Sequence, residues 1–130
     1  MTARFGSGGP YEEQFGYSRV VTTGPHAWVA GCTSVVEGEF VHEGDAAAQA
    51  RAAFAVALQA LDRAGFGRDD VVRTRMFVVD IRDNGDAVAV VHGEVFADVR
   101  PASSLIGIAG LIDPRMLVEV EVEAFRGEWA

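Results

Sequence analysis

The chain has 130 residues, 49% of them apolar, and carries 11 basic against 19 acidic side chains, which gives a formal net charge of −8. A chain of this length and apolar content can bury a substantial core in one domain, which excludes a disordered segment. The negative charge repels phosphate backbones, so we do not expect a nucleic acid partner.

The sequence contains no apolar run near the roughly 20 residues that a membrane-spanning helix requires. Residues 1–9 lack the basic and then apolar order of a signal peptide. Cys32 is the single cysteine of the chain, so no intrachain disulfide can form. We therefore expect a cytoplasmic protein without a membrane segment.

The first part of the chain predicts an irregular start followed by strands. Residues 1–14 are rich in glycine and contain Pro10, so we expect an irregular lead-in to a single domain over residues 15–130. Alternating and β-branched residues predict strands over residues 17–23, 26–36 and 39–42. Gly31 lies within the second of these strands, where a glycine indicates a bulge or a close approach by another group.

The spacing of apolar residues predicts two helices in the rest of the chain. Asp45 is the expected N-cap of the first helix, which runs to about Ala64 and is stopped by Gly65. Its apolar stripe consists of Ala50, Ala53, Phe54, Ala57, Leu58, Leu61 and Ala64. A strand over residues 71–81 and a polar turn with Asn84-Gly85 precede the second helix. The apolar side of that helix consists of Val88, Val91, Val95, Phe96 and Val99. Two final strands are predicted over residues 102–109 and 117–125.

The order of these elements, β-β-β-α-β-α-β-β, indicates an α+β fold (α/β-like) in which a single sheet carries both helices on one face. Two helices can cover only one side of a sheet of this size. The opposite side includes apolar positions, and an exposed apolar sheet face usually marks an interface. We therefore expect the chain to associate with copies of itself.

The segment from residue 100 to residue 125 carries two motifs in a characteristic order. Pro101-Ala102-Ser103-Ser104 is similar to the P-A-R-S motif of the Rid family (YjgF or L-PSP-like, reactive intermediate deaminase), and Leu117-Val118-Glu119 is similar to its L-V-E motif. Further family motifs are matched in order by Gly16-Tyr17-Ser18, Val29-Ala30-Gly31, Gln49-Ala50-Arg51 and residues 70–80. The resemblance covers residues 15–124. It implies a chorismate-mutase-like fold, a homotrimer with ligand clefts between subunits, and hydrolysis of imines or enamines without a cofactor.

Ser103 stands where the resemblance places an arginine that binds the substrate carboxylate. An arginine pairs with a carboxylate through two parallel hydrogen bonds, whereas a serine hydroxyl donates a single neutral one. Arg100 lies three residues away on the other face of the strand and is not a simple replacement. Ala89 and His92 also depart from the Asn and Tyr of the family's second helix. We therefore expect an altered specificity, with little activity on compounds of the 2-aminoacrylate type.

Three carboxylates, Glu119, Glu121 and Glu123, alternate with valines and share one face of the last predicted strand at intervals of about 7 Å. One interpretation is a solvated outer face of a half-buried strand. The other is that one carboxylate activates a water that attacks C=N, which requires a raised pKa in a partly dry cleft. Aligning residues 117–119 with the family's L-V-E motif selects Glu119 for this role, whereas aligning the family's E-A motif with the Glu-Ala of this chain selects Glu121. We prefer Glu119, because the first alignment requires only one inserted residue in the loop 112–114.

Five further residues are candidates for the site through the resemblance. Tyr17 matches a tyrosine that lines the family's cleft and is the second candidate catalytic residue, although a surface tyrosine explains it equally well. Gly31 would let a ligand approach the backbone or relieves a packing clash. Cys32 beside it is either a nucleophile in contact with that ligand or a small core residue. Ser103 and Ser104 would bind the ligand through hydroxyl or backbone N–H groups, or are plain edge-strand residues.

The histidines and the strand arginines have structural interpretations. His26, His42 and His92 have no metal-ligand spacing, so no metal site is expected. Arg73 and Arg75 share a strand face and are expected to pair with acidic residues of another strand or subunit rather than with substrate.

These observations favour an enzyme that hydrolyses an imine, an enamine or a related carbonyl compound in clefts between three subunits, with Glu119 handling water or proton transfer. A non-catalytic homotrimer that binds a small metabolite is the alternative. An endoribonuclease or translation inhibitor, which the resemblance also implies for some members, is a weaker alternative because the chain is acidic.

Overall fold

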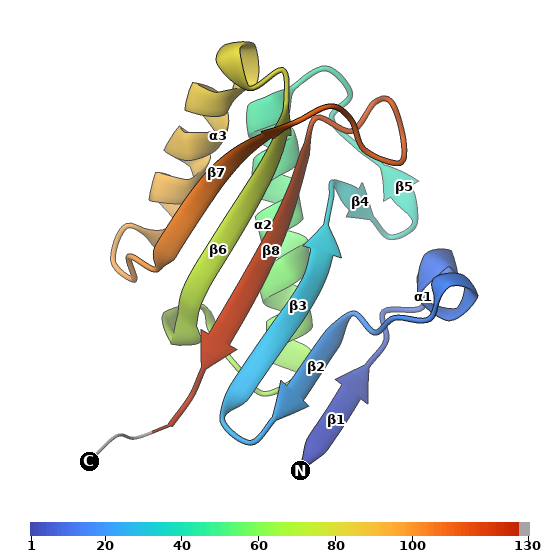
Figure 1. Ribbon diagram of the computed structural model, residues 1–130, viewed down its shortest axis with the longest axis vertical. Helices are drawn as coiled ribbons and strands as arrows, with labels where there is room; N and C mark the ends of the chain where they lie inside the picture. Colours follow the sequence, from blue (N-terminus) through green and yellow to red (C-terminus); the bar gives the residue numbers. More distant parts are fainter. Residues whose placement is uncertain (128–130) are drawn as a thin grey trace.

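The computed structural model describes residues 1–127 and contains a six-stranded mixed sheet (Figure 1). Its strands, in spatial order, are β1 (Thr2–Phe5), β2 (Val20–Thr23), β3 (His26–Cys32), β8 (Val118–Phe125), β6 (Val71–Val79) and β7 (Ala102–Ile108). Neighbouring strands are antiparallel except β6 and β7, which are parallel and are connected through a helix. A separate two-stranded hairpin is formed by β4 (Val35–Val36) and β5 (Glu39–Phe40).

Two long helices, α2 (Ala46–Arg63) and α3 (Ile81–Phe96), lie on one face of the sheet and leave the other face without a helical cover (Figure 1). Asp45 caps α2 as predicted, because its side chain accepts a hydrogen bond from the Ala48 N–H at 3.0 Å. A single 3₁₀ turn, η1 (Arg68–Asp70), precedes β6. The predicted α+β fold, with both long helices on one face, is confirmed. Among residues 1–127, no helix combines the length and the apolar character needed to cross a bilayer.

The core lies between the sheet and the two long helices. Alternate valines of β8 are at most 1% exposed: Val118, Val120 and Val122. Successive side chains of a strand point to opposite faces, so the glutamates between these valines lie on the uncovered face. Phe54 and Leu61 from α2 and Phe96 from α3 are the largest fully buried apolar side chains of this core. This packing fixes the position of β8 and therefore of the glutamates that it carries.

The N-terminal residues, expected to form an irregular lead-in, contain two regular elements instead. β1 pairs with β2 along the sheet edge, and Pro10 begins the short helix α1 (Pro10–Phe15). Proline at the first helical position loses no hydrogen bond, because that N–H has no partner within a helix. Gly16 ends α1 in the left-handed conformation, with a φ of 76°. Proline and glycine thus delimit a helix here.

Three strand boundaries differ from the prediction because of local turns. β2 begins at Val20 rather than at residue 17, since the N–H of Tyr17 still bonds to the Glu12 carbonyl oxygen of α1. β3 ends at Cys32 rather than at residue 36. Glu37 and Gly38 both have positive φ, 52° and 82°, which suits a tight two-residue turn. The residues on either side of this turn therefore pair as β4 and β5, and β5 ends before residue 42.

Asn84-Gly85 lies within α3 and not in the predicted turn. The Asn84 side chain donates a hydrogen bond to the Val79 carbonyl oxygen at 2.8 Å. A Cβ added at Gly85 would lie 3.0 Å from Ile81 Cγ1 and 3.7 Å from Leu105 Cδ2. Glycine is therefore used at this position for close packing of α3 on β7, and not for a turn.

Gln49 on α2 is fully buried and links this helix to two loops. Its amide nitrogen donates to the carbonyl oxygens of His42 and Arg115, each at 3.1 Å. Its Oε1 accepts a hydrogen bond from the Leu117 N–H at 2.8 Å. Without this side chain, the Arg115 carbonyl oxygen and the Leu117 N–H would lose this partner, at a cost of about 1–3 kcal/mol for each buried group, whereas the His42 carbonyl oxygen would keep the Asp45 N–H at 3.2 Å.

We predict that Gln49→Leu lowers the free energy of unfolding by about 2–4 kcal/mol, measured by urea denaturation. Gln59→Leu is the matched control, because Gln59 is exposed on the same helix, and it should change stability by less than about 0.5 kcal/mol. Equal stability of the two variants would contradict the linking role of Gln49.

Candidate functional site

The site is centred on a close approach between Gly31 of β3 and Glu119 of β8. A bulge lies between Val29 and Cys32, so β3 has one residue more than β8 in this stretch. A Cβ added at Gly31 would lie 2.6 Å from Glu119 Cδ and 2.8 and 2.9 Å from its two carboxylate oxygens. The sequence predicted a bulge or a close approach at Gly31, and both occur. The approaching group is a side chain of the same chain.

Burial is the main cause of an unusual ionisation of Glu119. The side chain is half-buried, and this desolvation raises the pKa of the carboxyl above its ordinary value. The neighbouring Glu121 carboxylate raises the pKa further, whereas the positive charge of Arg19 lowers it. A carboxyl with a raised pKa is suited to exchange protons with a substrate or a water near neutral pH.

Glu121 and Glu123 have a different environment, although they share a strand face with Glu119. Arg75 Nη1 lies 3.1 Å from Glu123 Oε2 and 3.7 Å from Glu121 Oε1. Glu119 lies opposite Phe77 of β6 and has no ion pair within residues 1–127. Arg75 therefore balances the two later carboxylates, as predicted for this arginine. Because Glu121 is paired with Arg75 and Glu119 is not, Glu119 is the better candidate for proton transfer.

Arg19 connects several parts of the site and was not identified from the sequence. Its side chain is 15% exposed, and Nη1 donates to the carbonyl oxygens of Gly31 at 2.6 Å and Ala30 at 3.3 Å. The guanidinium carbon lies 5.7 Å from the centre of the Tyr17 ring. In the sequence, only the position of Arg19 two residues after Tyr17 indicated a place near the site. That position does not reveal the contacts of Arg19 with β3.

Glu12 of α1 is a nearly buried partner of Arg19. Its side chain lies 3.4 Å from Arg19 Nε and accepts hydrogen bonds from the N–H and the hydroxyl of Ser7. Burial acts to raise the pKa of Glu12, but the Ser7 hydrogen bonds and the Arg19 charge outweigh it and lower that pKa. Glu12 is therefore ionised and balances the Arg19 charge.

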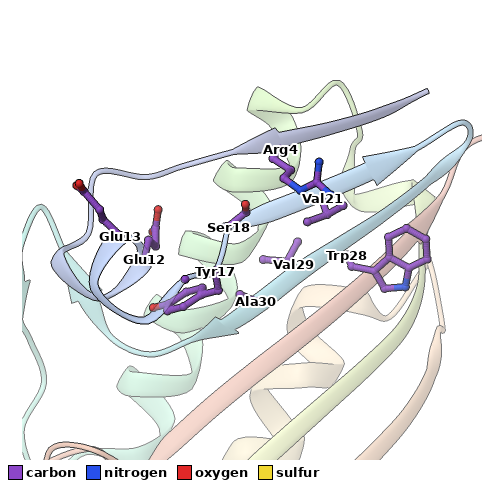
Figure 2. A pocket seen from close by; sticks show the side chains of 10 residues that line it. Arg4, Glu12, Glu13, Tyr17, Ser18, Val21, Trp28, Val29 and Ala30 are labelled. Carbon is purple, nitrogen blue, oxygen red and sulfur yellow. The ribbon is translucent and has the colours of Figure 1, made fainter.

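An open groove of about 610 Å³ lies beside this centre, along β1 to β3 and α1 (Figure 2). It is lined by Arg4, Glu12, Glu13, Gly16, Tyr17, Ser18, Val21, Trp28, Val29 and Ala30. Tyr17 lies toward one end, near Ala30, and Trp28 toward the other (Figure 2). Glu119 is not among the lining residues, but the groove includes Ala30, which precedes the Gly31 that Glu119 approaches.

Cys32 belongs to the core, which was one of its two sequence interpretations. It is 2% exposed, its thiol donates to the Ala30 carbonyl oxygen at 3.3 Å, and burial raises its pKa to about 11. The thiol is therefore protonated at neutral pH and packed away from the surface of this subunit. It contributes to the bulge and not to an accessible ligand contact.

Ser103 and Ser104 lie on β7, away from the other candidates. In the order β3-β8-β6-β7, three strand spacings separate β7 from β3, or roughly 14 Å. The Ser103 hydroxyl accepts a hydrogen bond from Thr74 at 2.8 Å, and Thr74 also contacts His92 Nε2 at 2.8 Å. The Ser104 hydroxyl lies on the opposite face of β7 and accepts a hydrogen bond from Arg73 Nη2 at 2.8 Å. The chain therefore links Tyr17, Gly31 and Glu119 through Arg19 and the bulge, and keeps the two serines apart from them.

We predict that Gly31→Ala displaces the Glu119 carboxylate without unfolding the protein. The overlap is with the end of a flexible side chain, and the φ of Gly31 lies outside the region that favours glycine. The change of Glu119 rotamer should be visible in a crystal structure of the variant. Gly93→Ala is the matched control, because a Cβ there meets nothing within 4 Å. An unmoved carboxylate in Gly31→Ala would refute the close approach.

Comparison with known proteins identifies the family of the chain. The family model described as Endoribonuclease L-PSP matches residues 11–126. The uncharacterized protein SCO2049 of Streptomyces coelicolor is 44% identical over 124 residues, which cover 95% of this chain and 92% of that protein. The 3-aminoacrylate deaminase RutC of Acinetobacter baylyi is 34% identical over 94 residues, which cover 72% of this chain and 73% of RutC.

A solved structure supports the same relationship. Rv2704 of Mycobacterium tuberculosis, described as a member of the YjgF/YER057c/UK114 family, is 38% identical to this chain and matches its structure with a TM-score of 0.87. The match covers 96% of this chain and 99% of Rv2704. The family resemblance of the sequence motifs is thereby confirmed. The chain belongs to the YjgF/Rid family, whose family model is described as Endoribonuclease L-PSP.

Proposed function

We propose that the protein hydrolyses an imine, an enamine or a related carbonyl compound, with Glu119 as the proton-transfer group. The observation that carries this proposal is the half-buried Glu119 carboxyl with a raised pKa, which rests on the Gly31 backbone in the part of the chain that also carries Tyr17. RutC, named as a 3-aminoacrylate deaminase, is a relative whose reaction belongs to the same chemical class.

The proposed reaction converts a C=N compound and water into a carbonyl compound and an amine or ammonia. The Glu119 carboxylate accepts a proton from water while the water oxygen bonds to the imine carbon, and the nitrogen takes up a proton from solvent, which is returned to solvent when the hydroxyl proton is lost in the last step. The protonated carboxyl then returns its proton to the nitrogen of the resulting carbinolamine. The C–N bond breaks, the nitrogen leaves as the amine, and the hydroxyl proton is lost as the C=O bond forms. Tyr17 is proposed to contact the substrate at the edge of the groove.

The environment of Ser103 supports a specificity that differs from that of relatives with an arginine at this position. Its hydroxyl is hydrogen-bonded to Thr74 and offers no positive charge to a substrate. We propose that the preferred substrate lacks the carboxylate of 2-aminoacrylate-type compounds.

We propose that the active form is a homotrimer. Ser103 and Ser104 lie on β7 and are separated within one chain from Gly31 on β3 and Glu119 on β8. Contacts between copies would bring the β7 residues of one copy to the Glu119 region of another. The face without helices carries Trp28 and Ile106, which are 40% and 38% exposed. Large apolar side chains on an uncovered sheet face favour such an interface.

We predict that the protein is a trimer at micromolar concentration, as measured by multi-angle light scattering. The expected mass is about three times the 13.9 kDa of one chain. A well-folded monomer under these conditions would leave the proposed clefts without their second wall and would contradict this part of the proposal.

A second candidate function is the binding of a small metabolite without chemistry. The observation that favours it is the groove itself, which has Tyr17 and Trp28 among its lining residues but not Glu119. Ligand affinity would then be unaffected by changes at Glu119. The endoribonuclease activity in the description of the family model has less support, because the uncovered face presents the carboxylates of β8 to any phosphate backbone.

We predict that Glu119→Gln lowers kcat about 10²- to 10⁴-fold for hydrolysis of imines made in situ by an amine oxidase. These imines carry no carboxylate. Imines made by an amino-acid oxidase do carry one and should be poorer substrates of the parent protein. Equal rates for the two classes would contradict the specificity inferred from Ser103.

The control for this experiment is Glu123→Gln, a change on the same strand face that leaves Glu119 intact. Because the fold raises the pKa of Glu119, it disfavours the ionised carboxylate at neutral pH. Glu119→Gln should therefore be at least as stable as the parent there, so lost turnover would not reflect unfolding. Full activity of Glu119→Gln would exclude the proposed role.

A further inference from the structure

The bulge of β3 accepts side-chain hydrogen bonds from the Cys32 thiol and from a largely buried arginine, and only the arginine reaches both of its carbonyl oxygens. Arg19 lies between α1 and β2, and its Nη1 contacts the carbonyl oxygens of both Ala30 and Gly31. The backbone adds a further bond, from the Ala30 N–H to the Arg19 carbonyl oxygen at 2.9 Å. A bulge disrupts the regular pairing of a strand, so its backbone groups need partners from elsewhere. Arg19 supplies them at the residue over which Glu119 lies.

The arginine is held in place by a second chain of contacts. Glu12 lies 3.4 Å from Arg19 Nε and is 8% exposed, and Ser7 bonds to the Glu12 carboxylate through its N–H and its hydroxyl. A charge removed from water is stabilised only when it is paired and hydrogen-bonded. Ser7, Glu12 and Arg19 thus form a balanced chain that leads from the N-terminal segment to the bulge.

These contacts leave Arg19 unsuited to act as the missing substrate-binding arginine. A bidentate pair with a carboxylate requires two parallel N–H donors that both face the ligand. Here Nη1 is directed to backbone carbonyls and Nε faces Glu12. The guanidinium therefore acts on the protein backbone, and its effect on a substrate is indirect.

The charged and titratable groups that interact with Glu119 come from three segments. Glu121 follows on β8, Arg19 precedes β2 and Cys32 lies on β3. Glu12 of α1 acts on this group through its ion pair with Arg19. The residue opposite Glu119 on β6 is Phe77, which does not titrate. Arg19 is thus the cation in residues 1–127 that favours the ionised form of Glu119, and Glu121 opposes it.

We propose that Arg19 is a positioning residue of the active site, which fixes the bulge carbonyls of Ala30 and Gly31 and thereby the seat of the Glu119 carboxylate. This inference rests on the proposed function of Glu119. Its consequence is that the N-terminal segment, through Ser7 and Glu12, takes part in setting the geometry of the reaction centre.

The first test is a carbon-13 NMR titration of the Glu119 carboxyl, assigned with Glu119→Gln, in Arg19→Gln and in the parent. Loss of the cation should move the Glu119 titration midpoint to higher pH. Glu12→Gln, which keeps the cation and removes its counter-charge, should move it to lower pH. Arg51→Gln is the matched control, because Arg51 pairs with Glu94 at 3.0 Å on the surface, and it should leave the midpoint unchanged.

The second test is kinetic. Displacement of the carboxylate in Arg19→Gln should lower kcat about 100-fold with a smaller change in KM, and the acidic limb of the pH–kcat profile should move to higher pH. Arg19→Lys restores the charge and one donor, so it should recover part of the rate.

The outcomes separate this inference from the proposed function. A lower melting temperature of Arg19→Gln with an unchanged Glu119 midpoint and carbon-13 shift would overturn the positioning role. If Arg19→Gln does not fold, Arg19→Lys is measured instead. An unchanged carbon-13 shift of the Glu119 carboxyl in that variant would also overturn the positioning role. An inactive parent protein whose Glu119 midpoint still responds to Arg19 would reject the proposed reaction while the control of this carboxylate by Arg19 stands.

Discussion

The close approach of the Glu119 carboxylate to the Gly31 backbone is the contact on which the candidate site depends. A side chain at position 31 would occupy the space of the carboxylate, with its Cβ only 2.6 Å from Cδ. The approach requires that β3 and β8 stay in register, and the buried valines of β8 ensure this through the core. The packing that stabilises the sheet thus also sets the position of the Glu119 carboxyl.

Three identical side chains on one strand face acquire different chemistry from their neighbours. Glu121 and Glu123 contact Arg75 and are balanced by it. Glu119 is half-buried, lies over a bulge and has its pKa raised by desolvation. Environment rather than residue type separates a carboxyl with a raised pKa from carboxylates in an ion pair, as in other sites where neighbouring carboxyls differ in ionisation. The proposed chemistry rests on this difference along one strand face.

Local patterns predicted most of the fold but only part of the site. The alternation of valine and glutamate in residues 117–125 predicted which face of β8 is buried, and Gly31 predicted a bulge or a close approach. Asn84-Gly85 misled, because glycine there serves the packing of α3 and not a turn. Arg19 and Glu12 were missed, since their roles depend on contacts with residues 30 and 31 that no local pattern encodes. The separation of Ser103 from Glu119 likewise follows from strand order, which only the folded chain defines.

The proposed hydrolysis of a C=N compound depends on the ionisation of one carboxyl, that of Glu119. The most direct measurement is the titration of the Glu119 side-chain carboxyl in the unmodified protein by carbon-13 NMR. The account predicts a midpoint above 4.5, the ordinary value for a glutamate. A midpoint at or below 4.5 would contradict it, because Glu119 would then be an ordinary solvated carboxylate with no advantage in proton transfer.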